Sequence, residues 1–85
     1  MKTIMAIMVG RRKETAEKVQ KLLTGWGCLI KMRLGCHEGV LDNCSDEGLI
    51  ILELVGDPEK HEELARKLNL IKDCSAEFMR LSLDK

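Results

Sequence analysis

Two segments of the chain, residues 2–9 and 48–55, are apolar on both of their alternating faces. No other feature limits the fold as strongly. In the first segment, one face carries Ile4, Ala6 and Met8, and the other carries Met5, Ile7 and Val9. In the second segment, GLIILELV, only Glu53 interrupts the apolar run. Apolar residues on both faces are typical of strands that are covered on both sides. The sequence therefore predicts two central strands of a sheet.

Two other segments show helical spacing. Residues 14–26 carry an apolar stripe that ends at Trp26, and residues 58–68 repeat the pattern. The pair Asp57-Pro58 is typical of a helix start, because a capping carboxylate precedes a proline in the first turn. Asn69 is expected to end this second helix in a left-handed conformation. His61 falls among charged residues and is expected on its wet side.

Two further segments have the two-residue period of strands. Residues 75–83 close the chain with Met79, Leu81 and Leu83 on one face and Phe78 on the other. Residues 29–34 alternate cleanly, which is typical of an edge strand. Their expected inward set is Ile30, Met32 and Leu34, and their expected outward set is Lys31 and Arg33.

The resulting element order, β-α-β-β-α-β, predicts an α+β sandwich of the ferredoxin-like kind. Two right-handed crossovers separated by a hairpin give an antiparallel sheet with the strand order 4-1-3-2. This order places the first and third strands in the centre, and those are the two strands that are apolar on both faces. At 85 residues the chain has room for a single domain, residues 1–85.

Charge and composition exclude several classes of protein. Fourteen basic residues balance fourteen acidic ones, so no net charge favours direct nucleic-acid binding or a membrane surface. No apolar run reaches the roughly 18 residues of a membrane span, and the apolar start lacks a signal-peptide cleavage site. We therefore expect a cytoplasmic protein, whose four cysteines are free thiols.

The predicted sheet has a face that its helices do not cover. Both helices of this fold pack on one side, yet the central strands also present apolar residues to the other side. Monomers rarely expose apolar patches larger than a few hundred Å². We therefore expect a homo-oligomer, a dimer or a tetramer, that forms through the open sheet face. The alternative is that strand propensity alone explains the pattern, with lysine and arginine stems lying over the face.

Several short stretches resemble one family of small ACT-like domains, and the likeness covers nearly the whole chain. They are Arg33-Leu34-Gly35, Asp46-Glu47-Gly48-Leu49-Ile50-Ile51-Leu52, Gly56-Asp57 and the pair Leu64 and Leu68. The chain is similar here to the iron-only hydrogenase system regulators. The resemblance implies an ACT-like ferredoxin fold, self-association, a role near iron-only hydrogenases and no catalytic residues. ACT-type domains usually bind small effectors between subunits, near the loop after the first strand. This chain lacks the Asp-x-x-Gly type of amino-acid-binding loop there.

The loop after the first strand is a candidate anion site. Gly10, Arg11 and Arg12 stand between a strand and a helix start, where backbone N–H groups and guanidinium groups can bind a carboxylate or a phosphate. Cations at a helix N-terminus oppose the helix dipole, which favours an anionic partner such as a small effector. The alternative is a solvated basic turn.

A second candidate site contains Cys36, His37 and Cys44, in the connection between the second and third strands. Two thiolates and an imidazole are good ligands for zinc or a similar divalent ion. Their spacing matches no standard zinc motif, so free thiols are the alternative. Cys28 and Cys74 are expected to be small buried side chains.

These observations favour a non-catalytic regulatory or assembly module that binds a small effector or a protein partner and needs no cofactor. The alternative is a metal-responsive binding domain that uses Cys36, His37 and Cys44. No nucleophile–base arrangement or carboxylate pair indicates an enzyme. RNA-recognition and metallochaperone functions are disfavoured because the chain has one phenylalanine, one tryptophan and no Cys-x-x-Cys.

Overall fold

The computed structural model describes residues 1–10, 12–37 and 48–84. Its elements follow the predicted order, and their bounds are β1 Lys2–Val9, α1 Lys13–Gly25, the short helix η1 Gly27–Leu29, β2 Ile30–His37, β3 Gly48–Leu54, α2 Pro58–Asn69 and β4 Cys74–Leu81. All strand pairs are antiparallel, and the sheet order is β2-β3-β1-β4. This is the predicted order 4-1-3-2 counted from the other edge. The α+β architecture and the central position of β1 and β3 are therefore confirmed, and they are compatible with a ferredoxin-like fold.

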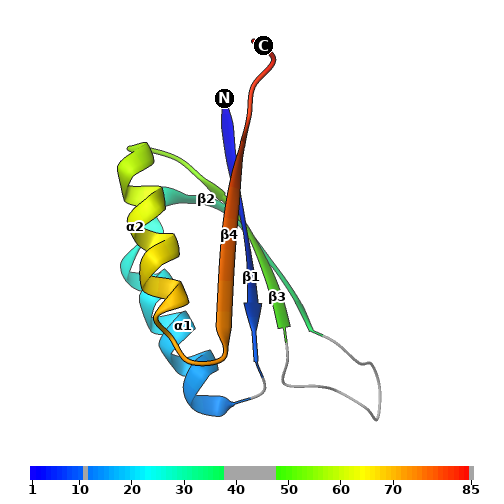
Figure 1. The fold of residues 1–85 in the computed structure, drawn as a ribbon, viewed down its shortest axis with the longest axis vertical. Coiled ribbons are helices and arrows are strands. Elements are labelled where there is room, and N and C mark those ends of the chain that lie inside the picture. Colours follow the sequence, from blue (N-terminus) through cyan, green and yellow to red (C-terminus); the bar gives the residue numbers. More distant parts are fainter. Residues whose placement is uncertain (11, 38–47, 85) are drawn as a thin grey trace.

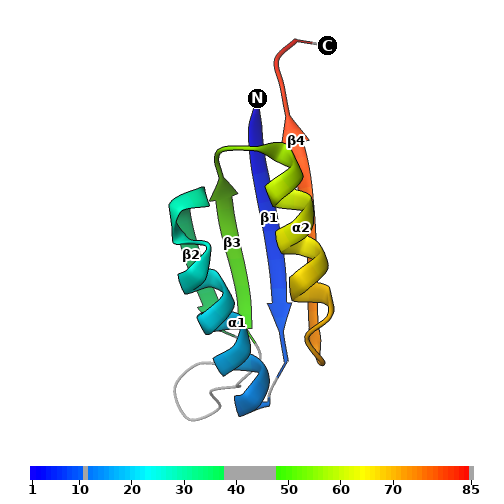
Figure 2. The same cartoon turned by 90° about the vertical axis from the view of Figure 1, so that its left-hand side faces the viewer.

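Both helices lie on one side of the sheet (Figure 1). Turned by a quarter, the same ribbon shows α1 in front of the β2–β3 half and α2 in front of the β1–β4 half (Figure 2). No helix among the described residues is long and apolar enough to span a bilayer.

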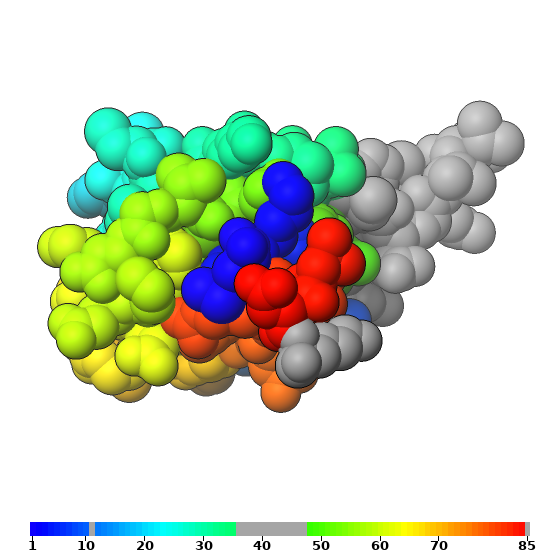
Figure 3. Space-filling view, turned by 90° about the horizontal axis from the view of Figure 1, so that it is seen from above, coloured from blue at the N-terminus to red at the C-terminus, as the bar shows by residue number. Residues whose placement is uncertain are grey.

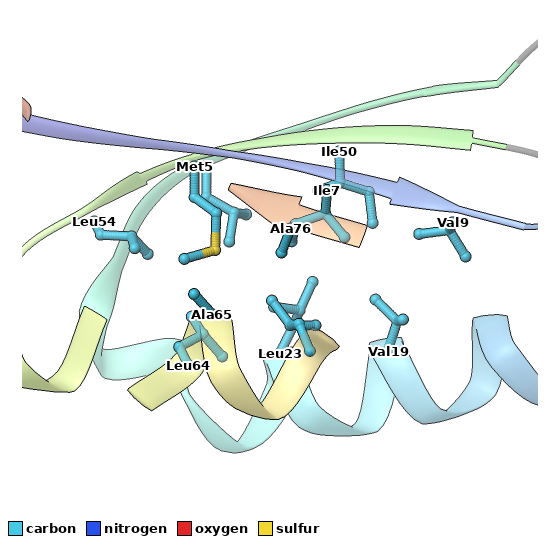
Figure 4. Close-up of a cluster of buried hydrophobic side chains, with 12 residues drawn as sticks. Met5, Ile7, Val9, Val19, Leu23, Ile50, Leu54, Leu64, Ala65 and Ala76 are labelled. Atoms are coloured by element: carbon cyan, nitrogen blue, oxygen red, sulfur yellow. The ribbon is translucent and has the colours of Figure 1, made fainter. Parts of the chain in front are cut away.

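The hydrophobic core lies between the two helices and the sheet (Figure 4). Met5, Ile7, Leu52 and Leu68 have no exposed surface, and Leu64 is only 1% exposed. Alternation along β1 and β3 sends every second residue into this layer, and the helical stripe of each helix meets them. Removal of this apolar surface from water is the main favourable term in the folding of such a domain.

A β-bulge changes which way β2 faces. The register shifts between Ile30 and Met32, so Ile30 pairs with Leu54 on the helix side, whereas Met32 pairs with Glu53 on the other side. An extra residue in one strand moves all later side chains to the opposite face. The prediction that Ile30, Met32 and Leu34 all point inward is therefore correct only for Ile30. Leu34 is 55% exposed.

The same bulge turns Arg33 toward the helices. Arg33 Nη2 donates a hydrogen bond of 2.6 Å to Gln20 Oε1 on α1. The predicted outward position of Arg33 is therefore wrong as well. Its guanidinium ties the edge strand β2 to the helix layer.

The start of α2 has the capping that the sequence predicts. Asp57 accepts a hydrogen bond of 3.0 Å from the Glu59 N–H, and Pro58 occupies the first turn. At its other end the prediction for Asn69 is wrong, because the chain continues from Asn69 into Leu70 in a right-handed conformation. Left-handed backbone occurs, within the described part of the chain, at Gly56 and Asp73.

Asn69 instead forms a clamp on the edge strand β4. Its Nδ2 donates to the Ala76 carbonyl at 2.9 Å, and its Oδ1 accepts from the Ala76 N–H at 2.8 Å. The backbone N–H that Ala76 gives to Asn69 therefore points away from β1. A side-chain amide can replace both hydrogen bonds that a neighbouring strand would make.

Candidate functional site

The sheet face opposite the helices is the largest candidate surface of the protein. We define the open face by nine apolar residues that the strand register places there: Ile4, Ala6, Met8, Met32, Leu34, Leu49, Ile51, Met79 and Leu81. No helix or strand among the described residues covers it. The most exposed members are Met8 at 61% and Met79 at 59%.

The pairing register arranges the open face in rows across the strands. The middle row runs from Leu34 through Ile51 and Ala6 to Glu77. Ala6 is the smallest side chain of this row, and a shallow hollow of about 310 Å³ lies over it between Ile4, Glu77 and Met79. At one end of the face Lys2 Nζ forms an ion pair of 3.2 Å with Glu53 Oε2. The surface is thus apolar in its centre and charged at its margins.

The predicted anion site lies at the opposite end of the molecule from the N-terminus of β1. Gly10 is buried, Arg12 is exposed, and Arg11 lies outside the described residues. Arg12 caps α1 without a side-chain hydrogen bond. Thr15, in the first turn, donates a hydrogen bond of 2.9 Å to the Lys72 carbonyl. The loop is therefore tied to the connection that leads into β4.

An internal carboxylate lies next to this loop. The Gly10 N–H donates to the Asp73 carbonyl at 2.9 Å, and the Asp73 carboxylate occupies the space that a side chain on residue 10 would need. A negative charge near a helix N-terminus is favourable. An acidic side chain of the chain itself therefore already fills the space beside Gly10. An external anion at Gly10, Arg11 and Arg12 stays a prediction.

We expect Gly10→Ala to lower the free energy of unfolding by about 1–3 kcal/mol, because the new methyl group overlaps the Asp73 side chain. Asp73 has a positive φ of 66°, a conformation that glycine adopts without strain. The double variant Gly10→Ala/Asp73→Gly should therefore recover most of the loss. Urea unfolding of the two single variants and the double variant measures this coupling. Equal stability of Gly10→Ala and the parent protein would contradict the contact.

The structure describes only part of the predicted cysteine–histidine site. Cys36 and His37 belong to the end of β2, and Cys44 lies in the undescribed segment 38–47. Among residues 1–10, 12–37 and 48–84, no group of three or more His, Cys, Asp or Glu side chains could hold a metal ion. Metal binding by Cys36, His37 and Cys44 stays a prediction.

The other two cysteines differ from each other. Cys28 is exposed in η1, so its predicted burial is wrong. A three-residue helix at the surface replaces the strand start that the sequence suggested. Cys74 is half-buried and packs against the core. Burial, and then the negative charge of Asp73, raises the pKa of the Cys74 thiol. Cys74 is therefore a poor nucleophile at neutral pH.

His61 is the clearest departure from the sequence prediction. It is 3% exposed rather than solvated. Its Nε2 lies 2.7 Å from the Val55 carbonyl, and because a carbonyl only accepts, Nε2–H is the donor. Its Nδ1 is buried and has no hydrogen-bond partner among the described residues. Helical spacing places residue 61 one turn before Leu64 and Ala65, and this signal outweighs its charged neighbours.

Comparisons with known proteins support the fold. No family model and no curated protein matches the chain. A search of solved structures finds an uncharacterized protein, TM1266, from Thermotoga maritima. The two are 25% identical, the match covers 95% of this chain and 96% of TM1266, and the TM-score is 0.82. The chain is thus similar over nearly its whole length to a solved protein of uncharacterized function.

Proposed function

We propose that the protein is a non-catalytic assembly module that associates with further copies of itself through the open face. The observation that carries this proposal is the exposure of Met8, Leu34, Met79 and Leu81, each more than half exposed on one continuous sheet surface. Burial of apolar surface contributes roughly 25 cal/mol per Å², from which the cost of association is subtracted. A second copy supplies a face of the same chemistry, and in a two-fold symmetric dimer the same patch of both copies forms the interface.

The finer part of the proposal rests on the family resemblance. It assigns the chain to the ACT-like variety of the ferredoxin-like fold and to the iron-only hydrogenase system regulators. In this proposal the oligomer, a dimer or a tetramer, is a cytoplasmic regulatory unit that binds a small effector or a protein partner. The basic loop at Gly10 is its predicted anion site. The proposal includes no catalytic step and no cofactor.

Sedimentation equilibrium between about 1 and 100 µM tests self-association. We expect a mass of two or four times the 9.6 kDa of the chain, with dissociation toward the low end of the range. Chemical oxidation of exposed methionines gives an independent measurement, because Met8 and Met79 should be protected at high concentration. A mass of 9.6 kDa at every concentration, with both methionines reactive, would refute the proposal.

A further inference from the structure

One carboxylate lies among the apolar residues of the open face. The strand register pairs Glu77 of β4 with Ala6 of β1, in the middle row of that face. β4 follows β1 along its whole length, and Figure 3 shows the start of β1 (blue) beside the red residues at the end of β4. Glu77 lines the hollow over Ala6 together with Ile4 and Met79, and it is exposed in the single chain.

The chain neutralises another carboxylate of this side, but not Glu77. Glu53 forms its ion pair of 3.2 Å with Lys2, at the end of the face where β1 begins. Glu77 forms no ion pair within the described part of the chain. The side chains that the register places around it are uncharged: Ile4, Ala6, Met8, Ser75 and Met79. In the single chain, water is therefore what stabilises this charge.

The charged groups of the adjoining segments lie away from Glu77. They are the Met1 amino group, Lys2, Lys72, Asp73 and Arg80. The first four are at least four residues from Glu77 in the strand register, which is about 13 Å at the rise of a strand. The Arg80 guanidinium lies on the helix side, where Nη2 donates to the Pro58 carbonyl at 3.2 Å. None of these cations is placed to compensate the carboxylate if the face is covered.

We propose that Glu77 opposes self-association through the open face and makes it depend on protonation, an inference that rests on the self-association proposed above. The exposed residues that carry that proposal include Met79 and Leu81 on β4 and Met8 on the adjoining strand. A copy that covers these three residues also covers Glu77, which lies between Met8 and Met79 in the register.

The direction of the effect follows from the cost of covering a charge. A carboxylate that is moved from water into apolar contact loses its hydration, and no cation compensates it here. A bound proton removes the charge, so the assembled form takes up protons more readily than the single chain. Association should therefore strengthen as the pH falls.

The variant Glu77→Gln tests the proposal, because it keeps the shape of the side chain and removes its charge. Each copy of a symmetric assembly contributes one such charge, so the dissociation constant from sedimentation equilibrium should fall at least about tenfold. Glu77→Asp keeps the charge and should associate no more tightly than the parent protein. The control Glu62→Gln, on an exposed position of α2, should leave the dissociation constant unchanged.

The pH dependence provides a second measurement. From about pH 7.5 to about pH 5.5 the parent protein should associate more tightly, and most of this gain should be absent in Glu77→Gln. Weaker association of Glu77→Gln would show that the carboxylate meets a cation of the second copy and would overturn the inference. An associated parent protein with the same dissociation constant as Glu77→Gln would refute this inference alone. Monomers of both proteins at every concentration would refute the proposed self-association as well.

Discussion

The double variant Met8→Lys/Leu34→Lys is expected to convert the self-associated protein to monomers. Both side chains are more than half exposed in the single chain, so the fold should tolerate the change. In a symmetric assembly each lysine occurs twice, and each replaces an apolar contact worth about 1.5–3 kcal/mol when fully buried. The dissociation constant measured by sedimentation equilibrium should therefore rise at least about a hundredfold.

A matched control for this variant is available on the helix layer. Leu70 is 73% exposed and follows α2, away from the open face. Leu70→Lys should leave the mass of the assembly unchanged. An oligomer that survives in the double variant, or that dissociates in Leu70→Lys, would show that association uses another surface.

The largest expected loss of stability comes from Leu68→Ala. Leu68 is fully buried under the sheet, and removal of its side chain leaves a cavity in a closely packed core. Such substitutions cost about 2–5 kcal/mol, a large part of the roughly 5–15 kcal/mol that stabilises a small domain. The melting temperature, followed by circular dichroism, should fall by at least about 10 °C.

The same substitution two residues later provides the control. Leu70→Ala removes the same atoms from an exposed position and should change the free energy of unfolding by no more than about 0.5 kcal/mol. Similar losses in Leu68→Ala and Leu70→Ala would contradict the placement of the core.

The sequence predicts the architecture well because each element has its own periodicity. The two strands that are apolar on both faces, β1 and β3, lie in the centre of the sheet, as expected. The start of α2 at Asp57-Pro58 is also local chemistry, since cap and proline act within one turn. Such features are determined by neighbours in the sequence and need no knowledge of the tertiary structure.

The predictions from sequence are wrong where contacts between separate elements determine the local structure. The bulge at Lys31 inverts β2 after Ile30, and nothing in the alternation of residues 29–34 marks it. Asparagine is a residue type typical of helix ends. The side-chain amide of Asn69 instead forms hydrogen bonds with Ala76 in β4, seven residues along the chain. Both outcomes follow from strand pairing and helix packing rather than from local preference.

The candidate sites show the same division. Gly10 is predictable as a punctuating residue, but the carboxylate beside it comes from Asp73, which is remote in the sequence. The pocket that His61, Lys2 and Lys31 line draws on four separate elements, so no sequence motif indicates it. Only the helical spacing of His61 relative to Leu64 could have signalled that this histidine is buried.

The amide clamp on β4 has a consequence for how copies can join. A strand of another molecule that paired with the outer edge of β4 could not bond to the Ala76 N–H, because this group already donates to Asn69 Oδ1. Natural proteins protect their edge strands in comparable ways against pairing with strands of other molecules, which leads to aggregation. Strand addition at β4 is therefore hindered near the start of the strand, where Asn69 already uses both backbone groups of Ala76.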